Sequence, residues 1–169
     1  MKSTQLEEFE SWYSREHSRI LSAVVLATGD LYLSQDAVDE AIVRAYDRWK
    51  RVGSMDSPSG WTLRVALNLV KRNFRRANRV YGTPALDTQE SVFPSTLHEV
   101  WKLVNRLSKR QREVVVLRYI GDLTEAQVAD ALGITRGTVS QTLRSAHLRL
   151  GEMLSDYVET KGNECDVSK

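Results

Sequence analysis

Apolar residues recur every three or four positions along most of this chain, a spacing typical of amphipathic helices. Glycine and proline, which interrupt helices, occur only 9 and 3 times in 169 residues. The sequence therefore predicts an all-α fold. The periodic stretches and their end signals place the helices near residues 5–28, 35–51, 59–79, 96–106, 109–120, 124–132 and 136–157.

Residues 81–95 depart from this pattern and predict a flexible linker. They combine two prolines and a glycine with small and acidic side chains. The linker would join two small helical domains, residues 1–80 and 96–158, and a tail would follow at 159–169. A flexible chain of this length spans roughly 20 Å on average and about 50 Å when extended.

Residues 123–150 contain the most informative pattern, a predicted helix-turn-helix. Thr124 is placed to cap the first helix, and Gln127 three positions later completes a capping box. Gly133 stands where the chain must turn sharply, and Thr135 is placed to cap the second helix. The residues expected to pack inside the motif are Val128, Ala129, Leu132 and Ile134.

The second helix of this motif has two distinct faces. Its expected buried stripe consists of Val139, Leu143, Ala146 and Leu150. Its outer face carries Arg136, Ser140, Gln141, Arg144 and His147. A polar and cationic helix face fits the major groove of DNA, where base edges offer donors and acceptors. The alternative is a two-helix packing unit with a solvated face, and the pattern as a whole favours DNA binding.

Residues 61–79 are a second candidate for nucleic-acid binding. On a helical wheel, an apolar arc about 100° wide comprises Leu63, Ala66, Leu67, Val70, Phe74 and Ala77. A basic arc about 140° wide holds Arg64, Asn68, Lys71, Arg72, Arg75, Arg76 and Arg79. Trp61, Val65 and Leu69 lie in or beside the basic arc, and cations interleaved with an aromatic favour single-stranded or melted nucleic acid. The alternative is a solvated basic face on which Trp61 covers a neighbouring helix.

Residues 34–51 form an acidic helix, which Ser34 is expected to cap. Its expected core side is Val38, Ala41, Ile42, Ala45 and Trp49. Asp36 and Glu40 are one turn apart, where like charges repel by a few tenths of a kcal/mol, although Glu40 can pair with Arg44. Such a face suits a basic partner and is equally compatible with an ordinary solvated helix.

The distribution of charge favours two separate partners. Residues 1–40 hold eight acidic and three basic side chains, and residues 57–86 hold six basic and no acidic ones, although the net charge is only +2. An acidic zone beside a basic zone predicts two partners, with nucleic acid at the basic zone.

The residue inventory excludes several function classes. Cys165 is the only cysteine, so neither an intrachain disulfide nor a cysteine-built zinc site is possible. His17, His98 and His147 are scattered without a nucleophile or metal-ligand spacing, so we expect no catalysis, metal or cofactor. No apolar run approaches the roughly 18 residues that span a bilayer, so we expect a cytoplasmic protein without a membrane partner.

Residues 5–155 resemble the extracytoplasmic-function (ECF) sigma factors, which direct bacterial RNA polymerase to promoters. Residues 36–49 are similar to that family's polymerase-binding helix, whose pattern begins D-x-x-Q-E. Asp36 and Glu40 match this pattern, and Asp39 replaces the usual glutamine.

The two candidate nucleic-acid segments carry the rest of the resemblance. Residues 61–76 are similar to the segment that melts and reads the −10 promoter element, with matches at Trp61, Val65, Ala66, Asn68, Arg75 and Arg76. Residues 107–150 are similar to the −35-reading domain, with matches at Gly137, Thr138, Val139 and Leu143. Ser140, Gln141 and Thr142 replace the usual Lys-Ser-Arg. The loss of two cations predicts a shallower salt dependence of DNA binding. The changed side chains predict that this chain prefers a −35 sequence different from that of its relatives.

The resemblance implies three binding surfaces. The implied polymerase-binding residues are Asp36, Asp39 and Glu40. The implied −10 contacts are Trp61, Arg64, Asn68, Lys71, Arg72, Arg75 and Arg76. The implied −35 contacts are Thr124, Arg136, Gly137, Thr138, Ser140, Gln141, Arg144 and His147. The implied partners are bacterial RNA polymerase core and promoter DNA, and family members often bind an anti-sigma factor as well.

Two other functions stay open at this point. A free-standing helix-turn-helix regulator would bind duplex DNA without polymerase, but it has no use for the basic helix at 61–79 or for the linker. A protein-interaction module that sequesters polymerase or another regulator is the third possibility. Cationic faces on two separate domains argue against it.

Overall fold

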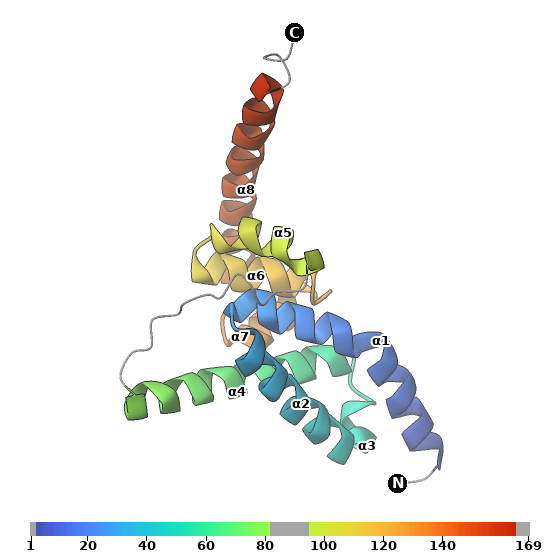
Figure 1. The fold of residues 1–169 in the computed structure, drawn as a ribbon. Coiled ribbons are helices and arrows are strands. Elements are labelled where there is room, and N and C mark those ends of the chain that lie inside the picture. The colour runs from blue at the N-terminus through green and yellow to red at the C-terminus, as the bar shows by residue number, and fades with distance from the viewer. Residues whose placement is uncertain (1–2, 82–94, 165–169) are drawn as a thin grey trace.

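The structure is a computed structural model that describes the backbone of residues 3–81 and 95–164, and within these ranges it contains helices and no strand. The helices are α1 (Ser3–Thr28), α2 (Leu31–Asp47), α3 (Trp49–Val52), α4 (Pro58–Tyr81), α5 (Ser95–Asn105), α6 (Lys109–Tyr119), α7 (Glu125–Leu132) and α8 (Arg136–Glu164). The predicted all-α class is confirmed. Helix α8 continues past its predicted end and projects from the body of the molecule (Figure 1). The predicted linker lies, apart from its two end residues, outside the described residues.

Helices α1 to α4 form the N-terminal half of the molecule, in which α1, α2 and α4 pack on one another. The predicted core residues of α2 and the first turns of α4 are buried, namely Val38, Ala41, Ile42, Ala45, Leu63, Ala66, Leu67 and Val70. Aromatic rings hold α1 against the short helix α3. The ring centroid of Trp49 lies 5.0 Å from that of Trp12 and 5.2 Å from that of Phe9.

Helix α2 begins earlier than predicted. Asp30 is its N-cap, and the carboxylate accepts a hydrogen bond from a backbone N–H of the first turn at 2.9 Å. Ser34, the predicted cap, is fully buried, and its hydroxyl lies 2.8 Å from the hydroxyl of Thr28 in α1. The predicted Ser34 cap is wrong because a carboxylate one turn upstream caps the helix, which leaves the serine to join α1 to α2. The predicted single helix also divides at Arg48 into α2 and α3.

In the C-terminal half, α5 to α8, the helix start and stop signals that the sequence predicts are present. The capping box of Thr124 and Gln127 forms at the start of α7, and Ser108 with Gln111 forms another at the start of α6. Gly133 ends α7 in the left-handed region, at φ 68°. The sharp turn of the helix-turn-helix therefore depends on the one residue type that adopts this φ without strain.

A buried aromatic contact joins α5 to α6. Trp101 is fully buried, and the guanidinium carbon of Arg112 lies 5.1 Å from the centroid of its ring. The same guanidinium donates a hydrogen bond to the Asn105 side-chain oxygen at 2.9 Å. Burial lowers the pKa of Arg112, and the carboxylate of Glu113 opposes this shift. This cation–π interaction between the partly buried Arg112 and Trp101 thus stabilises the C-terminal half.

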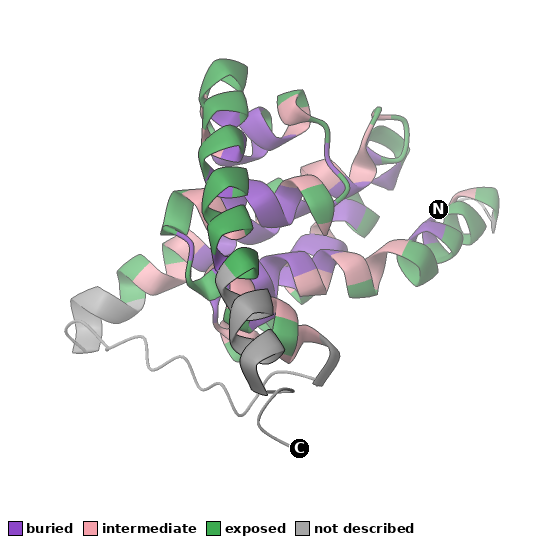
Figure 2. Ribbon diagram, turned by 90° about the horizontal axis from the view of Figure 1, so that it is seen from above, coloured by how far each residue is buried: buried purple, intermediate pink, exposed green. Residues whose placement is uncertain are grey.

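The two halves of the molecule pack against each other. Helix α6 lies on α1, and α7 lies on α4. Buried side chains from both halves belong to one hydrophobic cluster, and Figure 2 shows the buried segments gathered where the helices meet. The sequence predicts two helical units, but it does not predict this contact, because the contact joins residues far apart along the chain.

Gly133→Ala is expected to lower the free energy of unfolding by about 1–2 kcal/mol. The added Cβ would meet no atom within 4 Å, so the cost is the backbone strain alone. Gly133→Asn should cost less, since asparagine tolerates the left-handed region. Urea unfolding measures both effects.

Gly151→Ala in α8 is the matched control for this prediction. Its added Cβ also meets nothing within 4 Å, but the glycine has no positive φ. The substitution should raise the free energy of unfolding by up to about 1 kcal/mol through helix propensity. Destabilisation of the same size at both glycines would contradict the strain argument.

Candidate nucleic-acid interface

The first candidate surface is the outer face of α8, which we call the recognition face and define as Arg136, Ser140, Gln141, Arg144 and His147. All of these side chains are exposed, and so are Gly137 and Thr138 in the first turn. On the opposite side, Val139, Leu143 and Ala146 are buried as predicted. Thr135 caps the helix, since its hydroxyl accepts the Thr138 N–H at 3.1 Å. The start of α8 is therefore capped, and the positive end of the helix dipole lies beside Arg136, at the first turn of the recognition face.

Polar contacts within this surface reduce its net positive charge. The Ser140 hydroxyl donates to the carboxylate of Glu125, the first residue of α7, and the same carboxylate lies 3.9 Å from the Arg136 guanidinium. Further along α8, the Tyr119 hydroxyl lies 2.8 Å from Nε2 of His147. Neither Glu125 nor Tyr119 was predicted from the sequence, because both contacts cross between helices.

The second candidate surface is the cationic face of α4, which consists of Arg64, Asn68, Lys71, Arg72, Arg75 and Arg76. Lys71 is half-buried, and the other five side chains are exposed. Helix α4 carries no acidic residue. The carboxylate of Glu40 in α2 approaches this face and lies 3.9 Å from the Arg72 guanidinium. A face of this charge attracts the phosphates of a nucleic-acid backbone.

The apolar residues beside this cationic face belong to the packing of α4. Leu69 is buried, and Trp61 and Val65 are partly buried against the core cluster. Because α4 packs on α1, α2 and α7, it buries more of its circumference than one apolar arc. The placement of Leu69 in or beside the basic arc, as part of a nucleic-acid-binding face, is therefore wrong, because Leu69 is buried in the core. Trp61 packs against the core, as the alternative held, and it also lines a cleft beside Arg64.

The acidic residues of α2 form a third surface. Asp36 and Asp39 are exposed, and Glu40 is half-buried. Glu40 pairs with Arg44 one turn later, as the sequence predicted. Asp39 lies 4.0 Å from Nε2 of His17 in α1.

Exposed apolar side chains, which were not predicted from the sequence, flank these acids. Tyr32, Val43 and Tyr46 are 66%, 58% and 39% exposed. Together with Asp36 and Asp39 they recur every three or four residues, so they share one face of α2, which we call the α2 stripe. The sequence contained a signal for this stripe, because its residues occupy the helix positions opposite the predicted core residues of α2. Mixed apolar and acidic side chains on an exposed face are typical of a protein-docking surface.

Among the described residues, no three or more His, Cys, Asp or Glu side chains are grouped to hold a metal ion. Within the same ranges, no helix has both the length and the apolar character needed to span a bilayer.

The halves of the molecule match two family models. Residues 12–80 match Sigma-70 region 2, and residues 97–150 match Sigma-70, region 4. The first match contains the α2 stripe and the cationic face of α4, and the second contains the helix-turn-helix. The fold and its surfaces thus define the class of sigma-70-type transcription factors.

Curated relatives narrow the class. The chain is 30% identical over 142 residues to the ECF RNA polymerase sigma factor SigL of Mycobacterium tuberculosis, and the match covers 78% of this chain and 80% of SigL. It is 28% identical over 153 residues to the RNA polymerase sigma-E factor of Streptomyces coelicolor, with 87% and 86% covered. The chain belongs to the ECF RNA polymerase sigma factors.

Solved structures share the fold. One is the sigma factor RpoE of Bartonella quintana in complex with the anti-sigma factor NepR, with a TM-score of 0.68 and 17% identity over 88% of this chain and 98% of that chain. Another is CnrH in complex with the cytosolic domain of CnrY, with a TM-score of 0.58 and 21% identity over 88% of each chain.

As an ECF sigma factor, the chain directs RNA polymerase core to promoters in transcription initiation and is not itself an enzyme. The family resemblance drawn from the sequence is confirmed. The free-standing regulator is not favoured, because the match to Sigma-70 region 2 covers the basic helix that such a regulator has no use for.

Ser140→Lys is expected to steepen the salt dependence of duplex binding. The added cation neutralises one more phosphate, so the slope of log affinity against log salt should become more negative by up to about 0.9. Fluorescence anisotropy with a short mixed-sequence duplex measures it. Ser155→Lys, at an exposed position further along α8, is the control. The same change in slope for both variants would contradict a DNA-facing Ser140.

Proposed function

We propose that three surfaces divide the work of promoter recognition. The α2 stripe with Glu40 binds polymerase core, the cationic face of α4 with Trp61 holds the melted −10 strand, and the recognition face of α8 with Thr124 contacts the −35 duplex. The observation that carries this proposal is the separation of charge in the N-terminal half: an exposed acidic and apolar stripe on α2 and an exposed cationic face on the adjacent α4. In this proposal residues 1–80 and 96–158 act as separate units joined by residues 81–95.

At the −10 element, the chain supplies binding energy to open DNA. Melting of the duplex costs about 1.4 kcal/mol per base-pair step. Stacking of one unpaired base on an aromatic side chain contributes about 1–3 kcal/mol of binding free energy. The exposed side chains of Arg72, Arg75, Arg76 and Asn68 line one face and follow one strand. A handful of such contacts therefore offsets the opening of a short segment.

At the −35 element, the helix-turn-helix enters the major groove with α8. The first turn of a recognition helix contacts base edges while the preceding helix crosses the backbone. Arg136 and Arg144 supply positive charge, and Ser140 and Gln141 supply a hydroxyl and an amide where the family pattern has Lys and Ser. Bases are therefore read here through neutral hydrogen bonds, which gives this chain its own −35 preference.

The α2 stripe fits a basic protein surface. Its tyrosines are amphipathic anchors of the kind enriched at interface centres, and its carboxylates set orientation and the choice of partner. Polymerase core is the partner that family membership supplies.

The protein acts in the cytoplasm, where bacterial promoters and polymerase are found. An anti-sigma factor is a further partner. Its support is the likeness in fold to two sigma factors solved with NepR and with CnrY.

Run-off transcription tests this function. Core polymerase plus the chain, on a genomic fragment library of the source organism, should give discrete transcripts that core alone does not give. A chain that shifts duplex DNA tightly by itself yet never confers specific initiation would instead be a free-standing regulator.

Asp36→Lys is expected to weaken binding to polymerase core at least tenfold, since it reverses a charge within the proposed surface. Pull-down or anisotropy with labelled sigma factor measures the affinity. Glu10→Lys makes the same charge change at an exposed position of α1 and should have little effect. Equal losses for the two variants would indicate a general charge effect and contradict a specific role of the stripe.

A further inference from the structure

A carboxylate lies among the cations and polar side chains of the recognition face. Glu125, the first residue of α7, is half-buried, with 32% of its side chain exposed. It lines a groove of about 660 Å³ together with Ser140, Arg144 and His147 of α8. An acid in this place repels the phosphates of a duplex. Any contribution that Glu125 makes to DNA binding therefore lies in its hydrogen bonds and not in its charge.

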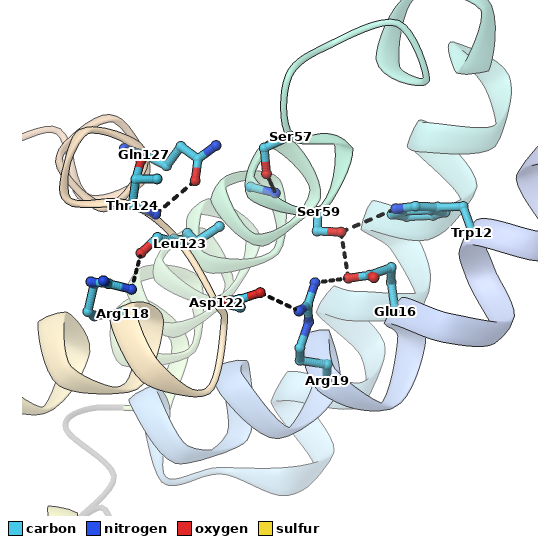
Figure 3. A network of polar contacts seen from close by, with 11 residues as sticks. Trp12, Glu16, Arg19, Ser57, Ser59, Arg118, Asp122, Leu123, Thr124 and Gln127 are labelled. Carbon is cyan, nitrogen blue, oxygen red and sulfur yellow. Dashed lines mark hydrogen bonds and ion pairs between the residues drawn. The ribbon is translucent and has the colours of Figure 1, made fainter.

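The start of α7 holds this carboxylate in place (Figure 3). The Thr124 hydroxyl accepts the Gln127 N–H at 3.3 Å, and the Gln127 side chain accepts the Thr124 N–H at 2.9 Å. The carbonyl of Leu123 accepts a hydrogen bond from the Arg118 guanidinium at 3.3 Å. Glu125 therefore projects from a backbone that hydrogen bonds hold on both sides.

The carboxylate determines what the Ser140 hydroxyl offers to a ligand. Ser140 donates its hydroxyl proton to Glu125, because a carboxylate only accepts hydrogen bonds. The second acceptor within reach, the Arg136 carbonyl, lies farther away at 3.3 Å and carries no net charge. Hydrogen bonds to an ionised acceptor are about twice as strong as neutral ones, so the proton stays with Glu125. The exposed oxygen of Ser140 is left with lone pairs alone.

An oxygen that only accepts hydrogen bonds distinguishes two kinds of base in the major groove. Adenine and cytosine present an amino group there, which donates a hydrogen bond, whereas guanine and thymine present a carbonyl oxygen, which only accepts. A free serine hydroxyl contacts either kind, since it can turn its proton toward a carbonyl. With that proton engaged, Ser140 pairs with an amino base, and a keto base would face a lone pair.

We infer that Glu125 is a specificity-determining residue that acts through Ser140. It makes the serine an obligate acceptor, so that at one position of the −35 element the chain selects the base pairs that turn an amino group toward Ser140. The inference rests on the proposed function, which places Ser140 against the −35 duplex. In this role Glu125 is a positioning residue, and adenine and cytosine are the bases that it favours on the contacted strand.

The second contact of Glu125 has a smaller effect. Its carboxylate lies 3.9 Å from the Arg136 guanidinium, and 76% of the arginine side chain is exposed. An exposed ion pair of this kind changes an affinity by about fivefold at most. It acts on charge and not on the direction of a proton, so it alters the strength of binding to every sequence alike. The choice between amino and keto bases therefore depends on the contact with Ser140.

Glu125→Ala is the first test. Holoenzyme assembled from polymerase core and the full chain selects from a randomised duplex library, and sequencing of the bound fraction gives the base preference at each position. At the −35 position that Ser140→Ala alters, wild-type holoenzyme should favour the two base pairs with A or C on one strand over the two with G or T about two- to tenfold, the effect of one neutral hydrogen bond. Glu125→Ala should bring this ratio to about 1, because the freed hydroxyl contacts either kind of base.

The double variant Glu125→Ala with Ser140→Ala tests whether the carboxylate acts through the serine. It should show the base preferences of Ser140→Ala alone, because the proton that Glu125 holds is then absent. Glu152→Ala is the control. It removes the same side chain from an exposed position of the same groove, further along α8, and should leave every base preference unchanged.

The outcomes separate this inference from the proposed function. If Ser140→Ala alters one −35 position and Glu125→Ala does not, the inference is overturned and the proposed −35 contact stands. An equal effect of Glu125→Ala with and without the serine would also overturn it, as would a wild-type preference that separates A·T from G·C pairs at that position. If Ser140→Ala alters no position, the proposed contact fails and the inference fails with it. A preference for amino bases that Glu125→Ala removes only in the presence of Ser140, and that Glu152→Ala leaves intact, would support it.

Discussion

The burial of α4 is the constraint on which the rest of the structure depends. This helix packs on α1, α2 and α7, so it is part of the core of one half and of the contact with the other. It must nevertheless leave one face to solvent, and that face carries cations and no acid. The core positions Leu63, Ala66 and Leu67 fix the rotation of the helix about its axis. Since each buried leucine contributes about 1.5–3 kcal/mol, packing rather than charge decides where the arginines point.

Local signals made much of the fold predictable. The ends of a helix are determined by residues close to them in the sequence. Thr124 and Gln127 mark the start of α7, and Gly133 marks its end. The same holds for the recognition face, because exposed and buried positions of α8 alternate with helical periodicity. The family resemblance added the assignment of each segment, which periodicity alone does not supply.

Features that depend on contacts between distant residues were not predictable. The buried Ser34 became part of the α1–α2 junction because Thr28 lies beside it and Asp30 provides a better cap. Leu69 is buried because α4 packs on several helices, whereas a wheel assumes one buried side. The packing of Leu123 beside Gly60 joins two halves across the predicted linker, and neither residue alone signals it.

Glu40 raises the question of whether polymerase binding and DNA binding are coupled through charge. Its carboxylate pairs with Arg44 and lies 3.9 Å from Arg72, so one acid connects the proposed polymerase surface with a proposed −10 contact. The Arg72 and Glu40 side chains are 65% and 42% exposed, and exposed pairs contribute only about 0.2–1 kcal/mol. A polymerase cation that engaged Glu40 would therefore change the affinity of Arg72 for phosphate by about fivefold at most. The packing of α2 on α4 involves several buried side chains and is much stronger. The two surfaces are therefore related by fixed geometry, so under the proposed function the docking of polymerase on α2 sets the position in which α4 meets the open strand.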